Sequence, residues 1–232
     1  MNRHYLIAVA WLAALWLAAF PPSSRAGTVV DRIVATVNGR IILQSDWDDA
    51  IRYQALVDKQ PLDAITVDER KAALDHLIDQ ELLKEQMSAA DFRHAADEEI
   101  AQQISEIRKQ YPGAEEPGGW STLLSRYGFT EAEVKQHVAS QIDLMRLVDQ
   151  HLRPNVNIDS HSIESYYNQE LLPQLRQSGV GDVPLAEVTP KIKELLTQQK
   201  VNELLVAWLH NLRSGSDIRT EVGTAGAGED LR

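Results

Sequence analysis

The chain has 232 residues, of which 34 are acidic and 23 are basic, and its formal net charge is −11. Such an acidic excess argues against binding to nucleic acid or to an anionic lipid surface, since both require clustered Lys and Arg. The chain has no cysteine, which excludes disulfides, thiol chemistry, cysteine-based metal sites and a lipid anchor on an N-terminal cysteine.

The first 26 residues have the features of an export signal. Arg3 supplies a positive charge, residues 5–20 contain no charged side chain, and Ser24 and Ala26 are the small residues that a signal peptidase reads. The apolar run is shorter than the roughly 18–20 residues that cross a bilayer. We therefore expect cleavage after Ala26 and a mature protein outside the cytoplasm, with a retained membrane anchor as the alternative. Cleavage removes two basic residues and no acid, which leaves a net charge of −13.

A β-hairpin is predicted at the start of the mature chain. Residues 31–37 and 40–44 flank Asn38-Gly39, a pair that tolerates the positive φ angles of a type I′ turn. A two-residue loop pairs Val37 with Arg40, Thr36 with Ile41, Ala35 with Ile42 and Val34 with Leu43. Both faces of this hairpin are apolar, so we expect both to be covered. A lone hairpin is marginal in water, so we also expect a further strand.

Helices are predicted over most of the remaining chain. Capping-box spacing marks three helix starts, at Ser45 with Asp48, at Thr66 with Glu69 and at Thr130 with Glu133. The spacing of apolar residues predicts helices over about 20 residues from Thr66 and over about 95–110, 120–127, 130–152 and 163–172. The apolar face expected for the helix at 130–152 comprises Val134, Val138, Ile142, Met145, Val148 and Leu152.

The C-terminal part is predicted to return to the hairpin. A last long helix carries apolar residues up to Leu212, has Pro190 near its start, either in the first turn or at a kink, and ends at Gly215. A short strand near Ile218 then follows, and we expect it to pair with the hairpin. The predicted fold is mainly α with a small β-sheet.

One domain is expected over residues 27–222. It comprises an N-terminal part (27–173), a linker (174–182) and a C-terminal helix and strand (183–222). The Gly- and Ala-rich residues 223–232 are predicted to form a disordered tail.

No pattern of catalytic or ligand-binding residues is found. The histidines lack the spacing of zinc sites, and no phosphate-binding loop or Gly-x-Ser-x-Gly turn occurs. Asp46, Asp48 and Asp49 lack the glycine and distal glutamate of a calcium loop, so we interpret them as first-turn residues that complement a helix dipole. The sequence therefore predicts no catalytic residue, no metal and no cofactor.

Aromatic residues beside loops remain as candidates for a binding surface. Trp120, Tyr127, Tyr166 and Tyr167 lie in segments with few other apolar residues. They are either packing residues or part of an exposed apolar surface that holds another polypeptide. We select Trp120 and Tyr127 as the first candidates for contact with a bound polypeptide.

Several segments resemble the SurA-type periplasmic chaperones, in the order in which that family has them. They are Val-Val-Asp-Arg-Ile-Val-Ala-Thr-Val-Asn-Gly-Arg-Ile-Ile-Leu-Gln-Ser-Asp at 29–46, Leu-Asp-His-Leu-Ile-Asp-Gln-Glu-Leu-Leu-Lys-Glu at 74–85, and the stretches 124–147, 157–167 and 183–218. The resemblance covers nearly all of the mature chain. It implies a helical chaperone body in the periplasm whose N-terminal hairpin is completed by a C-terminal strand.

The chain departs from this family where its parvulin isomerase domains normally lie. Only about residues 174–181 separate the N- and C-terminal pieces, which is too short for a folded domain. Pro117-Gly118-Gly119 lies in the wrong place for the parvulin pattern. The resemblance therefore implies an ATP-independent holdase for unfolded secreted or outer-membrane polypeptides, without enzymatic activity. The alternatives are a prolyl cis/trans isomerase and a membrane-tethered interaction scaffold.

Overall fold

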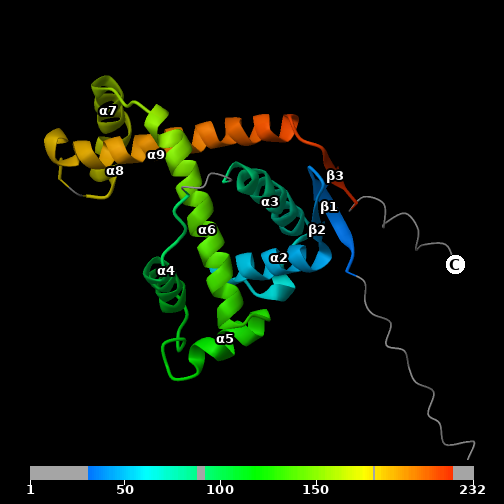
Figure 1. Ribbon diagram of the computed structural model, residues 1–232. Coiled ribbons are helices and arrows are strands. Elements are labelled where there is room, and N and C mark those ends of the chain that lie inside the picture. Colours follow the sequence, from blue (N-terminus) through cyan, green and yellow to red (C-terminus); the bar gives the residue numbers. More distant parts are fainter. Residues whose placement is uncertain (1–30, 88–91, 180, 222–232) are drawn as a thin grey trace, which may run out of the picture. The chain divides into compact units, whose positions relative to one another are not determined.

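The computed structural model describes residues 31–87, 92–179 and 181–221 (Figure 1). The predicted export signal at 1–26 and the predicted tail at 223–232 lie outside the described residues. Three short strands, β1 (Ile33–Val37), β2 (Arg40–Leu43) and β3 (Ile218–Thr220), form an antiparallel sheet in the order β2-β1-β3. The mainly α fold with a small sheet is confirmed, as is the pairing of the C-terminal strand with the hairpin.

The hairpin turn has the predicted geometry. Asn38 and Gly39 both have positive φ angles, 50° and 84°, as a type I′ turn requires. The register confirms three of the four expected pairs, but Leu43 lies opposite Ile33 rather than Val34. The cause is a bulge between Ile33 and Ala35, which a two-residue loop alone does not predict.

The expectation that both hairpin faces are covered is wrong. Val34, Ala35, Val37 and Ile42 are buried, whereas Ile41 is 54% exposed and Ile33 is 40% exposed. The bulged strand adds Val34 to the side chains that pack on the helices, so one face of the sheet is covered by the core and the other retains exposed isoleucines.

Helices make up most of the described chain. Their bounds are α2 (Gln44–Asp58), α3 (Val67–Gln86), α4 (Asp97–Lys109), α5 (Gly119–Tyr127), α6 (Glu131–Leu152), α7 (Ser160–Tyr166), a π-helical turn (Tyr167–Leu171), α8 (Leu172–Gln177) and α9 (Leu185–Ser214). Short 3₁₀ turns lie at Leu62–Ala64 and Arg153–Asn155. The first residues of the predicted linker at 174–182 therefore belong to α8. Pro190 lies in the second turn of α9, inside the helix rather than in its first turn.

Capping explains where the helices begin. Thr66 and Thr130 each accept a hydrogen bond from the backbone amide three residues on, and Glu69 and Glu133 reach back to the cap, so both predicted capping boxes are confirmed. The third prediction, at Ser45, is wrong. Helix α2 starts earlier, and it is the Asp46 carboxylate that accepts a hydrogen bond from the backbone amide of Leu43, at 2.9 Å.

The core consists of three groups of buried apolar side chains. The first joins α2, α4, α5 and α6, with Leu56, Leu124 and Val134 almost fully buried. The second lies between the sheet and helices α2 and α3. The third joins the ends of α3 and α6 to α9 through Leu83, Leu147 and the half-buried Trp208.

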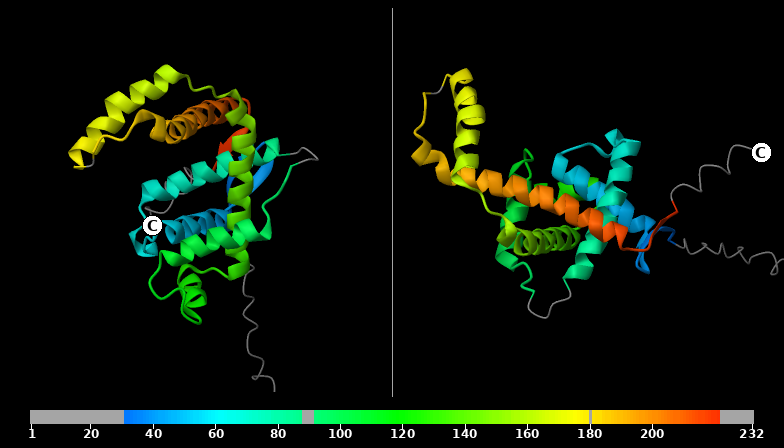
Figure 2. Two further views of the ribbon diagram at one scale, coloured as in Figure 1. Left: turned by 90° about the vertical axis from the view of Figure 1, so that its left-hand side faces the viewer. Right: turned by 90° about the horizontal axis from the view of Figure 1, so that it is seen from above.

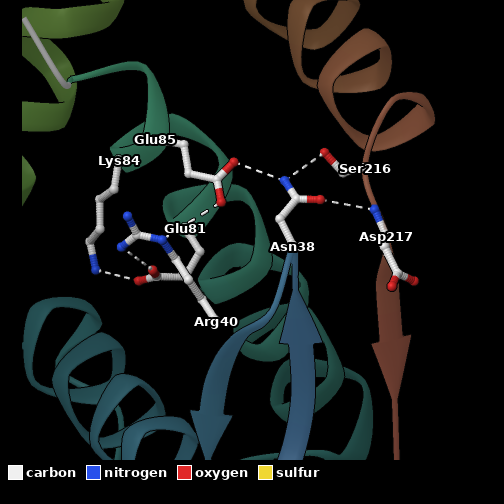
Figure 3. Close-up of polar contacts among 7 residues, drawn as sticks. All are labelled: Asn38, Arg40, Glu81, Lys84, Glu85, Ser216 and Asp217. Carbon is white, nitrogen blue, oxygen red and sulfur yellow. Dashed lines mark hydrogen bonds and ion pairs between the residues drawn. The ribbon is translucent and has the colours of Figure 1, made fainter.

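The C-terminal segment is tied to the N-terminal elements by polar contacts as well. Arg213 of α9 donates to the Asp79 carboxylate of α3 at 2.6 Å. At the hairpin turn, Asn38 donates from Nδ2 to Glu85 of α3 at 2.8 Å and to Ser216 at 3.2 Å, and its Oδ1 accepts from the backbone amide of Asp217 at 2.9 Å (Figure 3). One side chain therefore joins the hairpin, α3 and the segment that leads into β3.

Candidate functional site

A groove of about 1460 Å³ lies between helices α2, α3, α6 and α9. Figures 1 and 2 show α6 running past α9, α3 and α2 in turn, so residues far apart in the sequence line the same space. Two contacts hold neighbouring walls together. The Trp47 indole of α2 donates to the Arg70 carbonyl of α3 at 2.7 Å, and Tyr53 of α2 donates to Gln141 of α6 at 3.1 Å.

Apolar side chains form the floor of the groove and part of its rim. The buried ones are Ile42, Ile51, Ala55, Leu83, Leu144 and Val201, and those that reach solvent include Ile41, Ile65, Leu77, Ile142, Met145, Val148 and Leu205. Met145 is 64% exposed, although it lies on the apolar face predicted for α6. Exposed apolar side chains at the rim of a deep hollow are typical of a surface that holds an apolar ligand.

Side-chain amides are the second component of the lining. They belong to Gln54, Gln60, Gln80, Gln136, Gln141, Gln198 and Asn202. Within the described residues no hydrogen bond engages the amides of Gln80 or Gln136. Because each amide has both a donor and an acceptor, such a lining can bond to peptide N–H and C=O groups in either orientation. The groove therefore combines apolar contact area with hydrogen-bonding groups suited to a polypeptide backbone.

An aromatic cluster lies beside the α2 and α6 walls. The Tyr53 ring stacks on the His137 ring with centroids 4.6 Å apart, and Phe129 packs edge-on against both. Burial lowers the pKa of the His137 imidazole below its usual value and raises the pKa of the Tyr53 phenol to about 12. Both groups are therefore uncharged at neutral pH, and the cluster acts as an apolar surface with a few polar edges.

Trp120 and Tyr127, the residues predicted to contact a bound polypeptide, do not line this groove. They are 6% and 8% exposed and belong to the core group of α2, α4, α5 and α6. The Tyr127 hydroxyl donates to the backbone carbonyl of Gln60 at 3.2 Å, which supports the chain just after α2. The Trp120 indole nitrogen has no hydrogen-bond partner within the described residues. Burial favours the packing interpretation, and a direct contact with clients stays a prediction.

Sequence reasoning missed the groove residues because the groove exists only once four helices from distant segments are packed. Gln54, Gln136 and Gln198 are ordinary exposed helical residues when each helix is considered alone. One signal was present in the sequence. Leu144 and Met145 are adjacent in α6 and therefore cannot lie on the same face of the helix, and in the structure Leu144 is buried whereas Met145 is 64% exposed.

Other kinds of site find little support in the described part of the chain. Within residues 31–87, 92–179 and 181–221, no cluster of three or more His, Asp or Glu side chains is arranged to hold a metal ion. No helix among these residues has the length and hydrophobicity needed to span a membrane.

Comparison with protein families bears directly on this arrangement. A family model described as the SurA-like N-terminal domain matches residues 1–148, well over half of the chain. The chain belongs to the SurA-like N-terminal domain family. The match contains α2, α3 and most of α6, so three walls of the groove in this SurA-like protein lie within the family domain, whereas α9 lies beyond it. A comparison with curated proteins gives no match for the SurA-like chain.

Proposed function

We propose that this protein is an ATP-independent holdase that binds unfolded secreted or outer-membrane polypeptides in the periplasm, and that the groove between α2, α3, α6 and α9 holds the client. The observation that carries the proposal is the lining of that groove, which combines exposed apolar side chains with side-chain amides. Its volume of about 1460 Å³ exceeds the roughly 300–1,000 Å³ of typical small-molecule pockets, which favours a polypeptide segment as the ligand.

Binding in such a groove would be passive and reversible. Burial of one Leu- or Phe-sized client side chain contributes about 1.5–3 kcal/mol, whereas association costs roughly 4–15 kcal/mol in lost freedom. Several client side chains must therefore bind together, and a micromolar dissociation constant corresponds to about −8 kcal/mol. An affinity of this order keeps a client from aggregating and still permits release without an energy source.

The periplasmic location rests on two supports. The sequence resembles SurA-type periplasmic chaperones, and residues 1–26 have the pattern of a cleaved export signal. Clients that pass through that compartment before folding include secreted proteins and outer-membrane β-barrels. Determining the N-terminus of the mature protein distinguishes cleavage after Ala26 from a retained anchor, which is the scaffold alternative.

The test of the proposal is suppression of client aggregation by the mature protein from Gly27 onward. A denatured outer-membrane β-barrel protein is diluted into buffer with and without it, and light scattering is followed. We expect suppressed scattering. Unchanged scattering at several-fold excess would refute the holdase proposal. A proline-peptide isomerisation assay on the same sample checks the proposed lack of enzymatic activity.

A pair of double variants assigns the activity to the groove. Ile41→Thr with Met145→Gln removes two exposed apolar side chains from the groove, and Ile33→Thr with Val206→Gln removes two that are exposed elsewhere. We expect the first variant to require several times more protein for the same suppression, and the second to behave as wild type. Equal loss in both variants would indicate general surface hydrophobicity rather than the groove.

A further inference from the structure

More carboxylates than cationic side chains line the groove, and each of the cations is already paired with a carboxylate. Its lining contains three cationic side chains, Lys84, Arg146 and Arg153, and seven carboxylates: Asp46, Asp49, Asp58, Glu69, Glu81, Glu133 and Asp149. Each cation already has an acidic partner. Lys84 pairs with Glu81 at 2.6 Å, Arg146 with Glu99 at 2.8 Å, and Arg153 with both Asp149 and Glu194.

Four of the lining carboxylates have no cationic partner within the described residues. Asp46 and Asp58 each use one oxygen, for the Leu43 amide and for Gln54, and the other oxygen accepts no hydrogen bond there. Glu69 and Glu133 cap their helices, and the hydrogen bonds from Thr66 and Thr130 lower the pKa of both carboxyls, so they stay ionised in mild acid. The unneutralised charge of the groove is therefore negative.

The wall formed by α2 arranges this charge in a pattern. Asp46 and Asp58, which form no ion pair within the described residues, line the groove near the two ends of α2, and Asp49 between them is paired with Arg52. At about 1.5 Å of rise per residue, Asp46 and Asp58 are separated by roughly 18 Å along the helix. An extended chain advances about 3.3 Å per residue, so roughly five or six client residues span that distance. Tyr53 and Ala50 lie between the two carboxylates.

We propose that the groove prefers unfolded segments in which an apolar or aromatic centre is flanked by Lys or Arg, with the basic residues about five or six positions apart. The apolar centre lies against the Ala50–Tyr53 part of α2, and the flanking cations lie near Asp46 and Asp58. This inference rests on the proposed holdase function and adds a class of client to it. Lys59, the residue after Asp58, does not line the groove.

The test uses three fluorescent peptides that share one aromatic centre and carry Lys, Gln or Glu at two positions five residues apart. Binding to the mature protein is measured by anisotropy at low ionic strength and at about 0.5 M salt. We expect the Lys peptide to bind at least tenfold more tightly than the Glu peptide, a difference of about 1.4 kcal/mol. Salt should reduce that ratio strongly, since screening weakens contacts between exposed charges.

Matched variants locate the preference. Asp46→Asn with Asp58→Asn removes two groove charges and retains an acceptor oxygen at each position, so the cap on Leu43 can persist. Glu115→Gln with Glu116→Gln changes the net charge equally in an exposed loop outside the groove. We expect only the first pair to bring the Lys and Glu peptides to within about threefold of one another. An unchanged ratio in that variant would overturn the assignment.

The outcomes separate this inference from the proposed function. If the Gln peptide binds and aggregation is suppressed, but the Lys and Glu peptides bind equally, the holdase proposal stands and the preference for cationic segments is wrong. If none of the three peptides binds, the preference is wrong, and the scattering assay alone decides the holdase proposal.

Discussion

Replacing Asn38 with glycine should lower the free energy of unfolding by about 2–3 kcal/mol. The side chain makes three hydrogen bonds that join separate segments, to Glu85, to Ser216 and from the Asp217 amide, at 2.8, 3.2 and 2.9 Å. Exposed hydrogen bonds contribute about 0.5–1 kcal/mol each, and glycine adds several tenths through the entropy of the unfolded chain. Glycine also adopts the 50° φ angle without strain, so most of the loss reports the side-chain bonds.

The assay is equilibrium unfolding in urea, with thermal unfolding as a second measurement. For a domain of this size, each kcal/mol corresponds to about 2–4 °C, so Tm should fall by roughly 4–12 °C. Ser216→Ala removes only one of the three bonds and serves as the graded control, with an expected loss of about 0.5–1 kcal/mol. The two variants combined should lose less than the sum of their separate effects, since they share a contact. A loss below about 0.5 kcal/mol for Asn38→Gly would refute the assignment of this junction.

Three further predictions follow from the same structure. Truncation after Asn202 removes both strand β3 and the part of α9 that packs on α3, so cooperative unfolding should be lost. An unchanged urea midpoint would contradict the one-domain architecture. Trp120→Ala should lower the free energy of unfolding by about 3–5 kcal/mol and leave the peptide affinity of the folded protein within twofold of wild type. Lost affinity at unchanged stability would instead identify Trp120 as a client contact. Burial lowers the pKa of His137 in the folded state. The stability that the neutral His137 imidazole contributes is therefore complete above about pH 6.5 and declines as the pH falls. His137→Gln should reduce the loss of stability between about pH 7 and pH 5 relative to wild type.

Local rules predicted the elements that depend on neighbouring residues. The Asn38-Gly39 turn, the capping boxes at Thr66 and Thr130 and the end of the predicted helix at Tyr127 all follow from backbone preferences within a few residues. The pairing of β3 with the hairpin was also predicted, because a lone hairpin is marginal in water. These features needed no knowledge of how the helices pack.

The features that sequence reasoning missed depend on contacts between distant segments. The bulge at Val34 adds that side chain to the core on α2 and α3, which a hairpin considered alone does not require. The burial of Trp120 and Tyr127 is a second such feature, because their own segment is poor in apolar residues and α2, α4 and α6 supply their neighbours, while their contact with a client stays a prediction. The groove itself is formed by four helices, one of which lies more than 100 residues from the first.

Site-specific photo-crosslinking tests the central claim most directly, namely that the groove holds the client. A photoreactive amino acid is placed at Gln136, which lines the groove, or at the adjacent Lys135, which is exposed on α6 outside it. Each mature variant is then irradiated with an unfolded outer-membrane β-barrel protein. We predict a strong crosslink from position 136 and little from position 135. Equal yields from the two positions, or a stronger crosslink from 135, would contradict the account.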